Sequence, residues 1–280
     1  MEWSLSKLIR IESGAVSVSI TDLRTLLTHY GVGKADVEEL LELGRLGRER
    51  SWWNTYRDVA SHEYISFLGY EASASIIRNF EPLLVPGLLQ TEEYAREILS
   101  VVEGDSQRKV DALVDLRMER QELLQSSDDP TTLHFILDEA VVCRHVGGAG
   151  VMRRQLQHLL DAAQRPNVTL RVMPFERGIY PRLRVPYVLF EFPEPADEDV
   201  LYLESPQGQM IIREGAQEEE QEGMTPVAYL GVFWQLEQSA HKEDAPRMIE
   251  RALSRVARPD QEGGGPDRMP DNGPTLTPEG

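Results

Sequence analysis

The stretch DDPTTLHFILDEA, residues 128–140, marks a change in the hydrophobic period of the chain. Before it, the pattern over about 63–126 is helical. After it, Leu133, Phe135 and Leu137 alternate with other residues, as in a β-strand. The same alternation returns at 168–172, and an apolar stripe with helical spacing lies between the two segments. This alternation of strand and helix predicts a mixed fold rather than a helical bundle.

Outward from this stretch, the patterns predict an α+β chain. Short strands are expected at about 186–192, 200–204 and 209–213, followed by a helical region over about 226–256. Upstream, the apolar spacing predicts three short helices within the first 50 residues. The expected units are an all-α N-terminal module at 1–50, a junction at 51–63, a larger α+β domain at 64–257 and a disordered Pro- and Gly-rich tail at 258–280. A Glu-rich loop is expected at 214–223.

The net charge limits the classes of partner. The 280 residues hold 29 Lys and Arg against 47 Asp and Glu, which gives −18. Such a chain does not coat nucleic acid or an anionic membrane through bulk positive charge. However, residues 1–60 hold 8 basic and 9 acidic side chains, or −1, so the acidity belongs to the rest of the chain. A local DNA-reading surface in the first module is compatible with this distribution.

The sequence offers little for catalysis, cofactors or metals. The single cysteine, Cys143, cannot form an internal disulfide, which favours a reducing cytoplasm, and it is interpreted as a core residue rather than a nucleophile. The six histidines are scattered, and residues 147–150 lack the spacing of a nucleotide-binding glycine motif. Neither a transmembrane stretch nor a signal peptide is expected. We therefore expect a cytoplasmic protein that is not an enzyme and has no cofactor or metal site.

The N-terminal stretch WSLSKLIRIESG, residues 3–14, has the features of a capped helix. Ser4 is a suitable N-cap, and Leu8 and Ile11 fall on an inward face. Ser6, Lys7 and Arg10 then face outward, where they can reach base edges and phosphates in a major groove. Spacing alone fits a surface helix with two incidental cations equally well.

This stretch closely resembles the recognition helix of the Xre family of helix-turn-helix regulators. The resemblance implies DNA binding by Ser4, Ser6, Lys7 and Arg10, as a homodimer on paired half-sites. In that family two helices precede the recognition helix, whereas here the match begins almost at Met1. We therefore expect a misassigned start, with about 30–40 upstream residues missing. Without those helices Leu8 and Ile11 lose packing partners, and DNA binding weakens.

The resemblance continues over roughly 64–255. The segments that carry it include FEP at 80–82, LVPGLLQTEEYAR at 84–96, LRMERQ at 116–121 and YLE at 202–204. They are similar to a domain of unknown function that commonly follows Xre-type modules in filamentous soil bacteria. The resemblance implies a toxin–antitoxin-like transcriptional regulator, whose partner is a small protein encoded by a neighbouring gene.

Within this domain, Arg117 extends the apolar stripe of a helix, with Arg120 and Gln121 close behind. An arginine on an apolar face needs an acidic or carbonyl partner. One interpretation is a structural ion pair with Glu81 or Asp138. The other is a fork that holds an anionic ligand or the carboxylate of a partner.

Two further features leave alternatives open. The segment 86–91, with Pro86 and Gly87, fits a binding loop or a packed turn before a helix capped by Thr91. Trp52, Trp53 and Tyr56 fit packing at the junction or an exposed partner surface.

Two functions follow. The first is a DNA-binding transcriptional regulator whose C-terminal domain senses a ligand or binds a small partner protein. The alternative is a truncated protein-interaction module that does not bind DNA.

Overall fold

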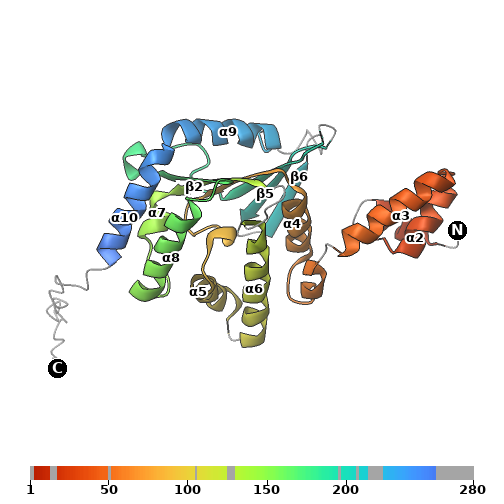
Figure 1. The fold of residues 1–280 in the computed structure, drawn as a ribbon, viewed down its shortest axis with the longest axis horizontal. Coiled ribbons are helices and arrows are strands. Elements are labelled where there is room, and N and C mark those ends of the chain that lie inside the picture. The colour runs from red at the N-terminus through yellow and green to blue at the C-terminus, as the bar shows by residue number, and fades with distance from the viewer. Residues whose placement is uncertain are drawn as a thin grey trace, which may run out of the picture.

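A computed structural model describes residues 3–12, 18–49, 52–104, 106–124, 130–194, 197–205, 208–213 and 223–256. These residues form ten α-helices and a six-stranded mixed sheet, which confirms the predicted α+β class (Figure 1). The expected tail at 258–280 and the Glu-rich loop, apart from residue 223, lie outside this range. No helix among the described residues is long and apolar enough to cross a membrane.

The N-terminal module consists of α1 (Leu5–Glu12), α2 (Ile20–His29) and α3 (Lys34–Glu49). Helix α1 begins directly after Ser4, the predicted N-cap, and all three helices lie within the first 50 residues, as the sequence predicts. Ser19 caps α2 by accepting a hydrogen bond from the Asp22 backbone N–H, and the chain leaves this helix through Gly31 at a φ of 72°. In Figure 1 these helices lie apart from the layers of the α+β domain.

The sheet combines a parallel half and an antiparallel half. Strand β1 (Ile76–Glu81) pairs in parallel with β2 (Thr132–Asp138), and β2 pairs in parallel with β3 (Val168–Met173). On the other edge of β1, β4 (Tyr187–Glu191) runs antiparallel, followed by β5 (Val200–Ser205) and β6 (Gly208–Arg213). The order β3-β2-β1-β4-β5-β6 places β1 where the two halves meet.

Helices cover both faces of the sheet. Helix α4 (His62–Ser73) precedes β1, and α5 (Glu92–Glu103) and α6 (Gln107–Arg120) connect β1 to β2. Helices α7 (Glu139–Cys143) and α8 (Gly148–Ala162) connect β2 to β3, and α9 (Pro226–Ser239) and α10 (Ala245–Val256) follow the sheet. Short 3-10 turns lie at Trp52–Tyr56, Gly87–Leu89, Gln121–Leu124, Phe175–Arg177 and Lys242–Asp244. Figure 1 shows α9 on one face and α4–α8 with α10 on the other.

Alternation along β1 explains this layering. Ile77 joins the larger core, beneath α4, α8 and α10, whereas Phe80 joins a smaller core under α9. Both side chains are almost completely buried, which contributes about 1.5–3 kcal/mol each. Asn79 and Glu81 share the face of Ile77, so β1 directs two polar side chains toward the helices.

The structure corrects two element predictions. Strand β1 lies inside the region predicted as helical, because its polar residues Arg78, Asn79 and Glu81 obscure the alternation. The predicted helical region over 226–256 is two helices, separated at Ala240. At the junction, Trp52, Trp53 and Tyr56 pack against the larger core, and the Tyr56 hydroxyl donates to Glu119 Oε1 at 2.8 Å. These aromatic side chains therefore pack onto the α+β domain.

Candidate functional site

A pocket of about 460 Å³ opens at the carboxyl end of β1. In open α/β sheets, ligands bind beyond the carboxyl ends of parallel strands, where the direction of the connections reverses. Here β1 sends its connection toward β2, and the chain later returns to its opposite edge as β4. This "β1 pocket" thus lies beyond the carboxyl end of a parallel strand, where the parallel and antiparallel halves of the sheet meet.

The floor of the β1 pocket is the helix-covered face of three adjacent strands. Asn79 of β1 pairs in register with Val188 of β4, which pairs with Tyr202 of β5. Two carboxyl groups complete the floor, Glu81 at the end of β1 and Glu204 near the end of β5. Each points to the same face as the residue two positions before it.

Helices α4, α5 and α6 and the loop after β1 form the walls. From α4 come Tyr64 and Phe67, and from α6 come Arg117 and Arg120. The apolar part of the wall consists of Leu84, Val85, Ile98, Leu99, Val102 and Leu113. The pocket thus has a polar floor and a partly apolar wall.

Arg120 is fixed by a buried ion pair. Its Nε and Nη2 donate to the two carboxylate oxygens of Glu71 at 2.8 and 2.7 Å, and its Nη1 donates to the Tyr64 hydroxyl at 2.5 Å. The side chains of Arg120 and Glu71 are only 6% and 3% exposed. A two-pronged pair of this kind is strong and directional. It ties α6 to α4, so Arg120 supports the wall instead of offering a free charge.

The loop after β1 is packed tightly onto this pair. A Cβ at Gly87 would lie 3.0 Å from Arg120 Nη1, so any larger residue there would push against the paired guanidinium. Gln121 Nε2 donates to the carbonyl of Gln90 at 2.5 Å and contacts that of Gly87 at 3.4 Å. Pro86 is buried and precedes the 3-10 turn, and Thr91 caps α5 as predicted. The segment is therefore a packed turn whose Gly87 also lines the pocket.

Arg117 is held differently from Arg120. Its Nη1 donates to Gln90 Oε1 at 2.7 Å, and Gln90 Nε2 in turn donates to the Val85 carbonyl at 2.7 Å. Among the described side chains, no ion pair joins Arg117 to Glu81 or Asp138, so that prediction is wrong. Asp138 instead caps α7 and accepts from the Tyr180 hydroxyl. The structural ion pair of this helix belongs to Arg120, and its partner is Glu71.

Two buried polar atoms of the pocket have no hydrogen-bond partner among the described residues: Asn79 Oδ1 and Arg117 Nε. Leaving such an atom unsatisfied costs about 1–3 kcal/mol. Both belong to residues that line the same pocket. A bound ligand that supplies a donor to Asn79 and an acceptor to Arg117 would remove both costs.

The carboxyl group of Glu81 has an unusual proton affinity. Burial raises the pKa of Glu81 to about 8, and the negative charge of Glu204 acts in the same direction, while Arg117 opposes it. Burial and Glu204 also raise the pKa of Tyr202 well above its usual range. At neutral pH Glu81 is therefore largely protonated.

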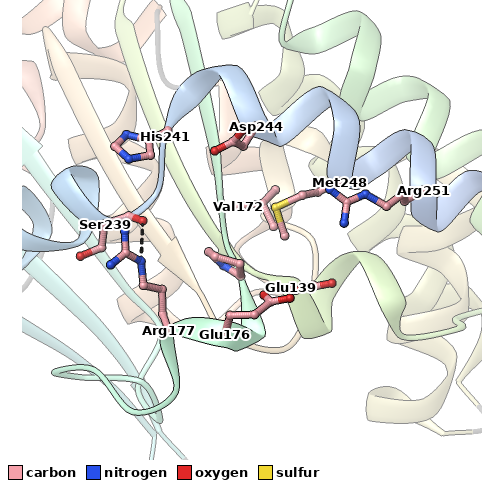
Figure 2. Close-up of a pocket in the computed structure, with 10 residues that line it drawn as sticks. Glu139, Val172, Glu176, Arg177, Ser239, His241, Asp244, Met248 and Arg251 are labelled. Carbon is pink, nitrogen blue, oxygen red and sulfur yellow. Dashed lines mark hydrogen bonds between the residues drawn. The ribbon is translucent and has the colours of Figure 1, made fainter.

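A second, smaller pocket of about 260 Å³ lies beyond β2 and β3, and Figure 2 shows its lining. Arg177 Nε donates to the Ser239 carbonyl at 3.1 Å, which is the dashed line in the figure. Glu139 Oε2 accepts from the Phe175 backbone N–H at 2.9 Å. Because these side chains bond to the backbone, they fasten the loop after β3 to α7 and to the end of α9.

The sequence-predicted DNA contacts lie in and just before α1. Ser4 is exposed and its Oγ accepts from the Lys7 backbone N–H at 3.2 Å, as expected of an N-cap. The Lys7 ammonium pairs with Asp22 at 2.9 Å and lies over the ring of Trp3. The side chains of Ser6 and Arg10 lie outside the described set. These residues are remote in the sequence from those of the β1 pocket.

Of the sequence-predicted ligand residues, Arg117, Arg120 and Gly87 line the β1 pocket, while Pro86 and Gln121 support its loop. Sequence reasoning missed Asn79 and did not place Glu81 or Glu204 in a pocket. Polar residues at alternate positions, followed by Pro82, were the available signal. Elsewhere, burial raises the pKa of the half-buried Cys143 thiol, and the described residues contain no group of three His, Cys, Asp or Glu that could hold a metal ion.

Comparisons with known proteins add one finding. No curated protein and no solved structure matches this chain. Residues 64–227 match a family described as Domain of unknown function (DUF5753). The matched region starts within α4 and ends within α9, so it includes the whole sheet and the lining of the β1 pocket apart from Val59, Ala60 and Ser61. Because this match covers more than half of its length, the chain belongs to the DUF5753 family.

Proposed function

We propose that this chain is a cytoplasmic DNA-binding transcriptional regulator whose α+β domain binds a small polar ligand in the β1 pocket. The observation that carries the proposal is the pair of unpartnered buried atoms, Asn79 Oδ1 and Arg117 Nε, in one pocket at the carboxyl end of β1. Proteins rarely leave such atoms unsatisfied, and exceptions call for an explanation. A ligand explains both.

The DNA-binding part rests on the resemblance of residues 3–14 to an Xre recognition helix. Two features of α1 support it: the exposed Ser4 cap and the exposed Lys7. The N-terminal end of a capped helix attracts phosphate. The near-neutral charge of residues 1–60, compared with the acidity downstream, also favours DNA contact at this module.

A gel-shift experiment tests the DNA-binding part. We expect the full chain to retard DNA from the region upstream of its own gene, with binding that weakens as salt rises from about 50 to 200 mM. Arg10→Ala should weaken binding about tenfold, because it removes a groove contact worth 1–3 kcal/mol. Arg251→Ala, on α10 at the other end of the molecule in Figure 1, is the matched control. Absence of retardation at low salt contradicts the proposal, as does an unchanged affinity of Arg10→Ala.

A second candidate function is protein interaction, either as a homodimer or with a small partner protein from a neighbouring gene. The observation that favours it is apolar exposure on the N-terminal module: Ile9 is 54% and Leu43 57% exposed. An interface on this module would cover both side chains. Light scattering on the full chain and on Leu43→Glu tests this candidate. A dimer that dissociates in the variant supports it, and a monomer in both cases contradicts the homodimer.

A further inference from the structure

Several polar side chains of the β1 pocket are already paired: Ser61 with Gln209, Lys109 with Glu103, and Arg120 with Glu71 and Tyr64. The charged and amide groups that remain include acceptors and a donor. The acceptors are Asn79 Oδ1 and the carboxyl groups of Glu81 and Glu204, all on the floor. The donor is the guanidinium of Arg117, which comes from α6 in the wall. A ligand that satisfies the whole pocket must therefore carry N–H donors at one end and an acceptor at the other.

The acceptors match the hydrogen-bonding capacity of an ammonium group. A primary ammonium has three donors and no acceptor. Asn79 and Glu81 lie two residues apart on one face of β1, and Glu204 lies on the same face of β5. A cation between the two carboxyl groups is attracted by the charge of Glu204 and favours the ionised form of Glu81.

Arg117 is prepared for a carboxylate. The bond from its Nη1 to Gln90 fixes the plane of the guanidinium, and Gln90 is itself 3% exposed and bonded to the Val85 carbonyl. The buried Nε remains without a partner among the described residues. A guanidinium held in this way recognises the planar carboxylate group.

The remaining wall is apolar. Ile98, Leu99 and Val102 of α5 face the pocket together with Leu113 of α6. The volume of about 460 Å³ lies in the lower half of the range of about 300–1,000 Å³ for small-molecule sites. The pocket therefore suits a compact ligand with an apolar side group rather than a long peptide.

We propose that the β1 pocket binds a free α-amino acid with an apolar side chain. Its ammonium group lies among Asn79, Glu81 and Glu204, its carboxylate meets Arg117, and its side chain packs on α5 and α6. This inference rests on the proposed ligand-binding function and specifies its ligand.

Binding of an ammonium group has a consequence for protons. The charged groups facing Glu81 are Glu204 of β5 and Arg117 of α6, with the hydroxyls of Tyr202, Tyr64 and Tyr94 nearby. The other cations of the wall are already paired, Arg120 with Glu71 and Lys109 with Glu103. The ammonium favours the ionised form of Glu81, so the ligand displaces a proton at neutral pH.

Isothermal titration calorimetry on the full chain tests this inference with L-leucine and L-phenylalanine as probes. L-leucinamide, which lacks the carboxylate, and N-acetyl-L-leucine, which lacks the ammonium, are the matched compounds. We expect L-leucine or L-phenylalanine to bind at least about tenfold more tightly than either analogue of leucine. Titrations at pH 7 in two buffers of different ionisation enthalpy should show the release of a proton on binding.

Variants assign the two ends of the ligand. Arg117→Gln should weaken L-leucine binding about tenfold while leaving L-leucinamide unchanged, and Glu81→Gln should abolish the proton release. Glu176→Gln and Arg251→Gln, both from the second pocket, are the matched controls and should change neither. Circular dichroism melting of each variant verifies that it is folded.

The outcomes separate the inference from the function on which it rests. Equal binding of L-leucine and its two analogues overturns the inference. The inference is also overturned if the chain binds only another class of compound, such as a nucleotide or a sugar, and Arg117→Gln abolishes that binding. This second result leaves the ligand-binding function intact. If neither the amino acids nor these other classes bind, both are overturned.

Discussion

At the scale of single residues, the most consequential contact is the buried pair of Glu71 and Arg120. The Glu71 carboxylate accepts two hydrogen bonds from Arg120, and the Tyr64 hydroxyl accepts a third. The ring of Phe67 lies 5.0 Å from the guanidinium carbon. Since the pair is almost completely buried, losing one partner leaves an uncompensated buried charge.

We predict that Glu71→Gln lowers the free energy of unfolding by about 3 kcal/mol. Glu92→Gln is the matched control, because Glu92 pairs with Arg96 in an exposed i,i+4 arrangement. Such a surface pair contributes at most about 1 kcal/mol. Urea denaturation of both variants measures the difference. Equal losses in the free energy of unfolding would show that the buried pair contributes no more than the exposed one.

The carboxyl group of Glu81 predicts a pH dependence of stability. Its pKa is raised to about 8 in the folded protein, from 4.5 when unperturbed. The folded state thus binds the proton more tightly than the unfolded state. The contribution of Glu81 to the free energy of unfolding is therefore full below pH 4.5 and is lost as the pH rises toward 8. The slope is at most about 1.4 kcal/mol per pH unit. Between pH 5 and pH 8, the free energy of unfolding should fall less for Glu81→Gln than for the unchanged chain, as urea denaturation measures. An identical fall in both proteins would contradict the raised pKa.

At the scale of elements, the loop after β1 depends on one glycine. Gly87 faces the guanidinium of Arg120, which Glu71 prevents from moving aside. Gly231, within α9, has nothing within 4 Å of the position of a Cβ. The same substitution therefore has opposite consequences in the two elements.

We predict that Gly87→Ala destabilises the protein by about 1–3 kcal/mol through overpacking. Gly231→Ala, in contrast, should stabilise it by about 0.5–1 kcal/mol, because glycine is unfavourable inside a helix. Thermal denaturation of both variants tests the signs. A stabilising Gly87→Ala would mean that the loop is looser than its contacts indicate.

The elements also show how far the sequence determines this fold. Strands with clean alternation, such as β2 and β3, and helices with clear caps, such as α5, were predicted correctly. Strand β1 was not, because its floor residues Asn79 and Glu81 are polar where a buried strand is expected to be apolar. Arg117 and Gly87 were recognised as ligand candidates from the sequence, whereas Asn79 was missed and Glu81 was considered only as an ion-pair partner. Which acid pairs with which arginine depends on tertiary packing that periodicity does not encode.

At the scale of the whole molecule, the cores of the α+β domain include none of the described side chains of the N-terminal module. The two largest clusters draw their side chains from Trp52 onward, and Leu26, Val37 and Leu41 are buried within the first three helices. Stability of the domain should therefore be independent of that module. The junction at Trp52 and Trp53 belongs to the domain.

We predict that deletion of residues 1–49 changes the melting temperature of the domain by less than about 2 °C. Deletion of residues 1–61, which also removes Trp52, Trp53 and Tyr56, should lower it by more than about 4 °C, because it uncovers part of the larger core. Differential scanning calorimetry measures both. A large loss with the shorter deletion would show that the module and the domain unfold together.

The register of the sheet also has a kinetic consequence. The β5–β6 pairing joins Ser205 to Gly208 and closes over a few residues, whereas the β1–β2 pairing joins Ile76 to Thr132, more than fifty residues away. Hairpins form in about 1–10 μs, but distant parallel pairings fold slowly because the chain entropy is lost before the contacts form. Glu204 belongs to the β5–β6 hairpin, which forms fast, whereas Asn79 and Glu81 belong to the β1–β2 pair, which forms slowly. The two sides of the β1 pocket therefore meet late in folding, so recovery of ligand binding should follow the slow phase of refolding.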